Sequence, residues 1–474
     1  MSRLDLVRAS DGKAGYLRCR PKRPAGCGPH DHLNRVRSGL PVQRSEVKLL
    51  PGERLERVHE LEIVDPPAMP DPLDELCKLA RVERPEEVGR NGPLIAARAT
   101  DANTGEAALR LFEIVYGRDS LVAALFVGDL FPLLREATVL YLANCQGERY
   151  DAWHEEEPGR IAHMIMNPNQ DANLGYPYFG TVDATPHFIS AVMHAIQARP
   201  TFEGEIRHAL AAAVAWLLRR LASDDLGLLS HQRVNPHGIT NQVWKDSWDS
   251  MSHADGTVAN HAAPVASLEA QALAYDALVE VGELQAADRL ARSVEKHFWL
   301  GDFYAIGVDR DPATGAPRPL GTRASNMGWL LRSRLLDGRE DRQRRIVELL
   351  FSDEFLAESG VRTLSNREVR FRSRSYHNGT VWPHDNYLIS LGLEQRGFVD
   401  EAQELRRRLA SFCRETHRFP EFVGGGEPGD APLTKRIVDV YDTVNDRPNR
   451  IEQPPQEIVC WTVTAMVAVE HARG

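Results

Sequence analysis

The stretch SLEAQALAYDALVEVGELQAADRLARSVEKHFW (Ser267–Trp299) decides the fold class. Apolar residues recur along it at positions i, i+3, i+4 and i+7, which is the spacing of amphipathic helices that pack in layers. From about Asn91 onward, most helical candidates repeat this pattern between loops of Gly, Pro, Asp and Asn. The other segments predicted to be helical are residues 119–146, 185–198, 205–222, 342–351, 386–397, 399–416 and 457–472.

This succession of helices predicts an all-α fold. Strand-like alternation is scarce, and roughly a dozen helices with long polar loops after every second helix fit an α/α toroid. In such a toroid, paired helices form a barrel, and loops at one end form the site. A superhelix of helical repeats is the alternative, although no fixed period of roughly 30 to 50 residues is present.

The first 90 or so residues differ in composition from the rest. A basic opening, RCRPKRPAGCGPHDH (residues 18–32), is followed by an acidic, proline-bearing stretch, EIVDPPAMPDPLDE (residues 62–75). We expect residues 1–90 to form a poorly ordered or extended arm with one short helix near Leu73–Arg81, and residues 91–474 to form the catalytic domain. The basic cluster is interpreted as a solvated tail rather than a patch for nucleic acid or phosphate.

Composition excludes several classes of function. The chain has 474 residues, 42% of them hydrophobic and 26% charged, which suits a soluble globular protein with a sizeable core. No apolar run approaches the roughly 20 residues of a membrane helix, and MSRLDLVRAS lacks the apolar region of a signal peptide, so we expect a cytoplasmic protein. A net charge of -10 disfavours nucleic acid and anionic membranes as partners, whereas a neutral ligand is not repelled. The oligomeric state is left open.

Six polar loops carry unusual residues. Most of them set tryptophan, tyrosine or histidine beside carboxylates. The loops are YGRDS (Tyr116–Ser120), WHEEEPGRIAH (Trp153–His163), YPYFGTVDATP (Tyr176–Pro186), NQVWKDSWDS (Asn241–Ser250), SYHNGTVWPHDN (Ser375–Asn386) and FPEFVGGG (Phe419–Gly426).

Taken singly, each carboxylate in these loops also fits a structural role. Asp119, Asp246 and Asp249 suit helix caps, and Glu421 suits a first helical turn. The run at residues 155–157 is typical of a solvated charged face. Each structural role is as reasonable as a functional one when one loop is considered alone.

Taken together, the loops have the composition of a carbohydrate site. Aromatic faces stack on the apolar side of a sugar ring, while Asp, Arg, His and Asn bond its hydroxyls. Hydrolysis of a glycosidic bond also needs two carboxyl groups, one to protonate the leaving oxygen and one to act as base or nucleophile. The chain offers Asp246 or Asp249 on one loop and Glu421 on another.

A metal hydrolase that uses His377, His384 and Asp385 is the rival interpretation. Their spacing matches no standard zinc motif. Pro383 also keeps the segment from running as one uninterrupted helix that would align the three side chains.

Nine motifs in this order resemble the amylo-alpha-1,6-glucosidase family, the glucosidase half of glycogen debranching enzymes, within the six-hairpin glycosidases. The resemblance runs from about Asn91 to the C-terminus and implies an (α/α)6 toroid. It further implies an exo-acting, inverting α-glycosidase with no metal or organic cofactor. The motifs are YGRDS, WHEEEPGRIAH, YFGTVDATPHF, WKDSWDSMSHADG, SLEAQALAYDAL, ASN (Ala324–Asn326), GVRTLS (Gly360–Ser365), SYHNGTVWPHDN and FPEF.

The same resemblance implies roles for individual residues. Asp246 corresponds to the general acid and Glu421 to the general base, while Asp249 competes for the acid role. Arg118 and Asp119 are similar to a pair that holds sugar hydroxyls in the innermost subsite. The expected substrate-binding residues are Tyr116, Arg118, Asp119, Asp183, Trp244, Lys245, His377, Asn378, Trp382, His384 and Asp385.

Departures from the family pattern bear on the substrate. Met164 stands where an acidic residue is expected and is followed by the insert NPNQDANLG, while VGGG and QPPQEIVCW replace other family segments. We therefore expect a carbohydrate substrate with a terminal α-linked glucosyl or similar residue in a small glucoside or oligosaccharide, rather than complete glycogen debranching. A trehalase-, invertase- or rhamnosidase-like specificity and a non-catalytic sugar-binding descendant are the alternatives.

Overall fold

The computed structural model describes side chains over residues 69–98, 113–165, 175–426 and 456–472, and backbone alone for five strands within residues 4–64 and 436–453. The chain divides into two compact units. One comprises Met1–Pro70 with Arg414–His417, and the other comprises Asp71–Cys413 with Arg418–Gly474. The larger unit therefore includes residues 71–90, which the sequence analysis placed in the N-terminal arm.

The first unit contains one described sheet. Its strands β1 (Leu4–Arg8), β2 (Ala14–Arg20) and β3 (Glu60–Val64) pair antiparallel in the order β1-β2-β3. Most of the basic cluster at residues 18–32 lies outside the described residues.

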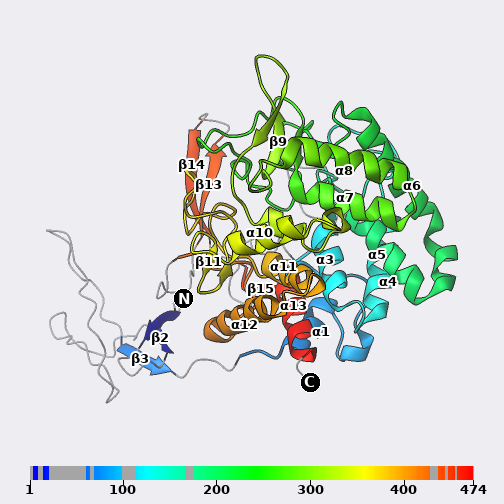
Figure 1. Ribbon diagram of the computed structural model, residues 1–474. Helices are drawn as coiled ribbons and strands as arrows, with labels where there is room; N and C mark the ends of the chain where they lie inside the picture. Colours follow the sequence, from blue (N-terminus) through cyan, green and yellow to red (C-terminus); the bar gives the residue numbers. More distant parts are fainter. Residues whose placement is uncertain are drawn as a thin grey trace. The chain divides into compact units, whose positions relative to one another are not determined.

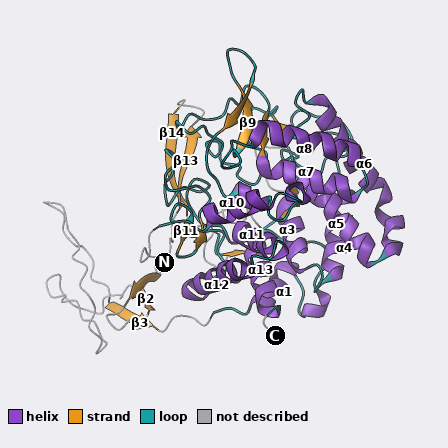
Figure 2. Cartoon of the chain, in the orientation of Figure 1, coloured by secondary structure: helices purple, strands orange, loops and turns teal. Residues whose placement is uncertain are grey.

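The second unit is built mainly from helices (Figure 2). Every segment predicted to be helical contains at least one helix, including the short one expected near Leu73–Arg81, whereas α9 was not predicted. The α-helices are α1 (Pro72–Ala80), α3 (Gly117–Val127), α4 (Pro132–Asn144), α5 (Ala184–Ala198), α6 (Glu203–Ser223), α7 (Leu268–Glu280), α8 (Leu284–Phe298), α9 (Asn326–Trp329), α10 (Glu340–Leu350), α11 (Pro383–Gln395), α12 (Val399–Thr416) and α13 (Cys460–His471).

Six of the described helices form a closed ring of neighbours through their contacts, and Figure 1 labels α3, α5, α7, α11 and α13 among them. In that ring α3 packs on α5, α5 on α7, α7 on α9, α9 on α11, α11 on α13, and α13 on α3. Helices α4, α6, α8 and α10 pack against α3, α5, α7 and α9, respectively. These four helix pairs and the ring of six neighbours are consistent with an all-α toroid.

Burial distinguishes the inner from the outer helices. Helix α13, CWTVTAMVAVEH, is apolar over most of its length, and nine of its twelve residues are buried, with Glu470 and His471 exposed at its C-terminal end. Helix α8, LQAADRLARSVEKHF, buries only one stripe that includes Leu290, Val294 and Phe298. A helix that is apolar all round belongs inside a layered fold, and one with a polar face belongs outside.

Close approach of two backbones makes Gly392 in α11 sensitive to substitution. A Cβ at this position would lie 2.6 Å from the amide nitrogen of Arg332 and 2.8 Å from the carbonyl carbon of Leu331. Gly392→Ala should therefore lower the free energy of unfolding by about 1–3 kcal/mol, because overlap with backbone outweighs the higher helix propensity of alanine. Urea denaturation measures the change.

Gly204 in α6 provides the control, because a Cβ there would meet nothing within 4 Å. Gly204→Ala should raise the free energy of unfolding by up to about 1 kcal/mol. A stabilising effect at both positions would contradict the contact described for Gly392.

Short strands link the helices of this unit, and the sequence pattern did not reveal them. Most of them have two to four residues and are too short to show clear alternation of apolar and polar residues, whereas β13 and β14 have seven residues each and were also not predicted. One sheet has the order β10-β9-β8-β7, and the other pairs are β15-β4, β5-β6, β11-β12 and β13-β14. The strands are β4 (Ala97–Arg98), β5 (Val115–Tyr116), β6 (Met164–Ile165), β7 (Ser230–His231), β8 (Val265–Ser267), β9 (Gly307–Arg310), β10 (Pro317–Leu320), β11 (Leu356–Ala357), β12 (Gly360–Val361), β13 (Arg436–Asp442), β14 (Arg447–Gln453) and β15 (Ile458–Val459).

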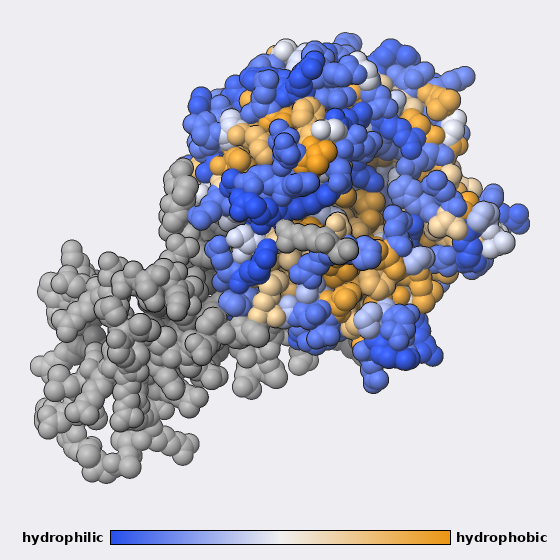
Figure 3. Space-filling view, turned by 60° about the horizontal axis from the view of Figure 1, so that its bottom comes forward, coloured by the Kyte–Doolittle hydropathy of each residue, from blue (hydrophilic) through white to orange (hydrophobic). Residues whose placement is uncertain are grey.

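The face of the molecule drawn in Figure 3 is largely hydrophilic where it is described, with smaller patches of hydrophobic residues. Among the helices that the structure describes, none combines the length and the apolar character needed to cross a bilayer.

Candidate active site

The N-terminal ends of several inner helices contribute to one cavity. Tyr116 directly precedes α3, His384 lies in the first turn of α11, and Trp461 lies in the first turn of α13. Pro383 is the first residue of α11, a position where the missing N–H of proline costs little. Loops from elsewhere in the chain bring Trp244, Asp246 and Glu421 to the same cavity.

The cavity has a volume of about 230 Å³. Pockets for small ligands span roughly 300–1,000 Å³, so this space suits a compact ligand such as a single sugar ring. The lining residues are Ala96, Ala97, Tyr116, Arg118, Asp119, His163, Met164, Trp244, Asp246, Tyr376, His377, Trp382, His384, Glu421, Gln456, Val459 and Trp461.

Arg118 and Asp119 are both buried in the first turn of α3. Asp183, immediately before α5, lies behind Arg118 with its Oδ2 3.3 Å from Arg118 Nη1, and its Oδ1 accepts a hydrogen bond from the hydroxyl of Thr181. Asp183 does not line the cavity itself. It fixes the arginine that does.

Asp119 has an unusual proton affinity. Burial raises its pKa to about 7, while Arg118 opposes the rise and the negative charges of Asp246 and Glu421 add to it. The pKa of an aspartate in the unfolded chain is about 3.9, so the folded state binds more protons between these two values. The stability of the wild-type protein should therefore fall as pH rises through this window.

Asp119→Asn should remove this pH dependence, because the amide does not ionise. We expect the variant to exceed the wild type in stability by on the order of 1–4 kcal/mol at pH 8, with the gain lost near pH 4. Thermal unfolding of both proteins between pH 4 and pH 8 measures it. Parallel curves for the two proteins would contradict the assigned proton affinity.

Asp246 lies on the loop between β7 and β8 and is about one-third exposed, at 34%. His377 Nδ1 is 3.9 Å from Asp246 Oδ1. The same nitrogen accepts a hydrogen bond of 3.3 Å from the backbone N–H of Ser247. The His377 imidazole therefore packs beside the Asp246 carboxyl group, and Ser247, the residue after Asp246, sets the orientation of the imidazole.

Glu421 is buried, at 3% exposure, in a loop that precedes α13 in sequence. The hydroxyl of Tyr376 donates to its Oε1, and the backbone N–H of Gln456 donates to its Oε2 at 3.2 Å. The Glu421 amide also donates to the Gln456 carbonyl at 2.9 Å. One oxygen of the carboxyl group accepts from a side-chain donor and the other from a backbone donor, and these contacts hold it in one place.

Aromatic rings make one wall of the cavity. Trp382 has stacked neighbours in His377, at 5.0 Å between ring centroids, and Phe422, at 5.4 Å. Its exposed fraction is only 2%, so Trp382 belongs to the wall more than to an open stacking platform. His384 stacks on Trp461 at 4.4 Å.

Three rings of this wall hold buried nitrogens without hydrogen-bond partners among the described side chains. They are Trp244 Nε1, His384 Nδ1 and Trp461 Nε1. Burial holds the pKa of His384 well below its usual range, and the charges of Arg118 and other nearby cations lower it further. A neutral imidazole and two indole N–H groups suit a neutral hydroxylated ligand.

Two expected binding residues lie behind the cavity instead of lining it. Lys245 Nζ donates to the carbonyl of Thr363 at 2.6 Å, and burial lowers its pKa to about 8. Asp385 Oδ1 accepts from the indole of Trp329 at 2.6 Å. Both side chains support the loops of the site from beneath.

Asn378 and Asp249 also lie outside the lining residues. The Asn378 amide donates to Asp249 Oδ2 at 3.1 Å, and Arg370 Nη1 lies 3.4 Å from the same oxygen. Asp249 is thus engaged with protein groups, whereas Asp246 lines the cavity.

The sequence analysis did not select several lining residues. The most informative are Tyr376, Gln456 and Trp461, which touch Glu421 or stack on His384. Tyr376 adjoins His377 in a stretch already noted for its polar side chains, so its position was a usable signal. Gln456 and Trp461 belong to QPPQEIVCW, which the sequence analysis noted only as a departure from the family pattern, and the sequence did not show which loops that segment meets.

The structure does not support two of the structural roles that the sequence analysis considered for the carboxylates. The run at residues 155–157 is not a solvated face, since Glu155 is only 4% exposed and none of the three is fully exposed. Glu421 lies in a loop and not in a helical turn. Among the residues with described side chains, no group of three or more His, Cys, Asp or Glu has an arrangement that would hold a metal.

Residues 268–423 match the family described as the mannosylglycerate hydrolase MGH1-like glycoside hydrolase domain. No curated protein sequence matches the chain. The structure resembles a GH63 mannosylglycerate hydrolase from Thermus thermophilus in complex with Tris, with a TM-score of 0.59 and 13% identity over 86% of this chain and 100% of the other. The same hydrolase in complex with glucose gives a TM-score of 0.57 at 14% identity over 85% and 100%.

At 13% identity, this structural likeness establishes the fold alone. The matching family is not the amylo-alpha-1,6-glucosidase family. The comparison therefore does not specifically support the resemblance to amylo-alpha-1,6-glucosidases that the motifs suggested. The chain has the fold of GH63 mannosylglycerate hydrolases, and the match over residues 268–423 supports a glycoside hydrolase of the six-hairpin group.

Proposed function

We propose that this protein is an inverting, exo-acting glycoside hydrolase that removes one α-linked sugar residue from a small glycoside. The observation that carries the proposal is the meeting of Asp246 and Glu421, from distant loops, at one cavity of about 230 Å³. Most glycoside hydrolases use two carboxyl groups that flank the sugar at the scissile bond.

In the proposed reaction, Asp246 is the general acid and Glu421 the general base. Asp246 gives its proton to the glycosidic oxygen as the bond from that oxygen to C1 breaks. Glu421 takes a proton from the water that forms the new bond to C1. The products are the free sugar, inverted at C1, and the aglycone alcohol.

The surroundings support this division of roles. Tyr376 and Gln456 present hydrogen-bond donors to Glu421, as suits a carboxylate that starts the reaction ionised. Asp249 is hydrogen-bonded to Asn378 and lies beside Arg370, which favours Asp246 as the acid. Carboxylates around the cavity also stabilise the positive charge that develops on the sugar in the transition state.

For the substrate, we propose a glucosyl or mannosyl residue with a small aglycone. The proposed binding groups for this residue are Arg118 and Asp119, with the aromatic wall. The fold is shared with a mannosylglycerate hydrolase whose structures hold Tris, glucose, or Tris with D-glycerate, so glycosylglycerates join simple glucosides as candidates.

A substrate panel with product analysis tests the proposal. It should contain mannosylglycerate, glucosylglycerate, trehalose, sucrose, isomaltose, and nitrophenyl α-glucoside, α-mannoside and α-rhamnoside. Turnover of at least one α-glycoside, with the β-anomer released first in the proton NMR spectrum, is expected. With a nitrophenyl glycoside or a glycosylglycerate, early release of the cleaved sugar as its α-anomer would contradict inversion. Sugar binding without turnover of any member of the panel would favour a non-catalytic protein.

A further inference from the structure

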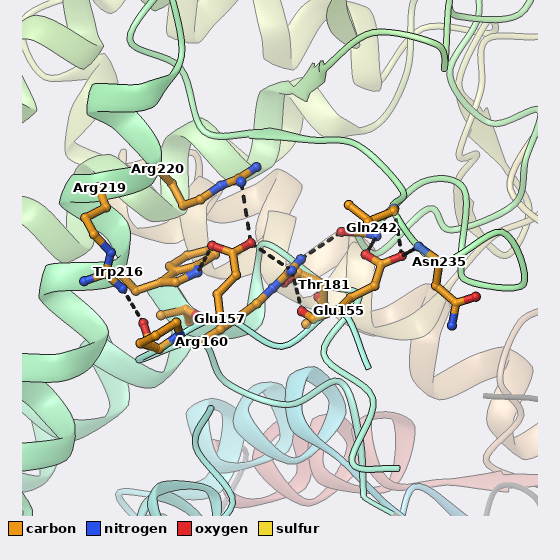
Figure 4. A network of polar contacts seen from close by, with 12 residues as sticks. Glu155, Glu157, Arg160, Thr181, Trp216, Arg219, Arg220, Asn235 and Gln242 are labelled. Carbon is orange, nitrogen blue, oxygen red and sulfur yellow. Dashed lines mark hydrogen bonds and ion pairs between the residues drawn. The ribbon is translucent and has the colours of Figure 1, made fainter. Parts of the chain in front are cut away.

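A buried polar network lies next to the candidate site and is not part of its lining (Figure 4). At its centre Arg160, 4% exposed, donates to groups from three loops. Its Nε donates to the Thr181 carbonyl at 3.1 Å, and its Nη1 donates to the Glu155 carbonyl at 2.8 Å. Its Nη2 donates to Gln242 Oε1 at 2.8 Å.

Glu155 completes the grip on Gln242. Its Oε2 accepts from the side-chain amide of Gln242, while its Oε1 accepts from the backbone N–H groups of Val234, at 3.1 Å, and Asn235, at 3.0 Å. Glu155 adopts a left-handed backbone conformation, with φ 53°, which is unfavourable for a residue with a side chain. Such conformations persist where the surrounding contacts determine them.

Both polar atoms of the Gln242 side-chain amide are consequently hydrogen-bonded, the oxygen to Arg160 and the nitrogen to Glu155. Arg160 can only donate and an ionised Glu155 can only accept, so one orientation of the amide satisfies both. The backbone carbonyl of Gln242 accepts from the backbone N–H of Val182 at 2.8 Å. The residue after Val182 is Asp183, which holds Arg118 in the cavity.

We propose that Gln242, held between Arg160 and Glu155, is a positioning residue for the general acid. Only Val243, Trp244 and Lys245 separate it from Asp246. The network thus ties the acid-bearing loop to the loop that orients Arg118, and so relates the acid to the sugar that Arg118 would hold. This inference rests on the proposed function of Asp246.

A merely stabilising network would act differently on the reaction. A displacement of about 1 Å in a catalytic group costs on the order of 100-fold in rate, whereas loss of stability alone leaves the rate of the folded fraction unchanged. Displacement of an acid also matters most when the leaving group needs a proton.

Gln242→Leu tests the proposal, and Glu157→Gln is its matched control. Glu157 contacts the same Arg160, at 3.2 Å, but on the side of α6, where it accepts from the Trp216 indole at 2.9 Å. Each variant removes a polar partner or a charge beside Arg160. Only the first disturbs the loop that carries Asp246.

We expect Gln242→Leu to lower kcat about 10- to 100-fold on a glycoside with an alkyl aglycone. The loss should be much smaller on a nitrophenyl glycoside, and KM should change less than about threefold, because the sugar-binding groups stay in place. Glu157→Gln should leave kcat within about threefold. A reduced melting temperature with unchanged kcat in Gln242→Leu, or equal losses in both variants, would overturn the proposal.

A pair of substitutions keeps the test decisive if Gln242→Leu does not fold. Glu155→Gln sets its NH₂ group against the NH₂ group of Gln242 and should lower kcat. The double variant Glu155→Gln with Gln242→Glu places a carboxylate acceptor at position 242 opposite the NH₂ donor at position 155, and should recover kcat. Failure of this recovery, with both proteins folded, would overturn the proposal. Asp246→Asn is measured in parallel: if it keeps the wild-type kcat, the proposed function fails, whereas loss there with an unaffected Gln242 variant refutes the positioning role alone.

Discussion

Asp246→Asn is expected to lower kcat about 10²–10⁴-fold on a glycoside with an alcohol aglycone. The amide has the size of the carboxyl group but no proton to give to the leaving oxygen at neutral pH. The side chain is one-third exposed, so we expect little change in melting temperature. Initial rates with alkyl and nitrophenyl glycosides measure the effect, and the nitrophenyl substrate should lose much less because its leaving group needs little protonation.

Asp249→Asn makes the same chemical change three positions along the loop. Its carboxylate bonds to Asn378 and not to the cavity, so the loss of rate should be smaller and should not depend on the leaving group. The reverse pattern, with the leaving-group dependence in Asp249→Asn, would transfer the role of general acid to Asp249.

Glu421→Gln is expected to lower kcat by a similar factor, about 10²–10⁴, on every substrate. The carbonyl oxygen of the amide still accepts from the Gln456 N–H, and its NH₂ group faces the Tyr376 hydroxyl, whose oxygen accepts, but the amide does not take a proton from water. Because the step affected is activation of the nucleophile, better leaving groups should not restore the rate. Steady-state kinetics on the same two classes of substrate distinguish this variant from Asp246→Asn.

Azide provides a direct check on Glu421. It attacks C1 without first losing a proton, so the C1–N bond forms while Asp246 protonates the departing oxygen. Turnover of Glu421→Gln should rise with added azide and yield a glycosyl azide of inverted configuration. Glu457→Gln, at a glutamate that is 40% exposed and pairs with Arg418, is the matched control and should keep the wild-type rate. A rate in Glu421→Gln close to that of this control would remove Glu421 from the mechanism.

The helical fold was readable from local patterns. Residues 267–299 show the helical period, and the structure places α7 and α8 there. The sequence pattern also distinguishes inner from outer helices. Helix α13 is apolar over most of its length and lies inside, whereas α8 has a single apolar stripe and lies outside. Short strands such as β7 and β8 left no such signal, because two or three residues do not show alternation.

The sequence predicted the residue types of the candidate site better than it predicted their arrangement in space. The composition of their loops predicts Asp246 and Glu421 as site residues, and both line the cavity. Lys245, which directly precedes Asp246, and Asp385, from the stretch Ser375–Asn386, lie outside the lining. Neighbours in sequence diverge here because successive side chains of a loop point in different directions, and their order does not say which one faces the ligand.

The amino-acid sequence by itself determined the helical class of this protein, the paired-helix pattern and the polar loops from which an acid and a base would come. These follow from periodicity and composition, which act over a few residues. Only the tertiary structure decided that Asp246 faces the cavity while Asp249 is bonded to Asn378, and that Gln456 meets Glu421. It likewise decided that Glu155 and Arg160 hold Gln242. These depend on contacts between segments far apart in the chain, which arise when the ring of helices closes and brings its loops together.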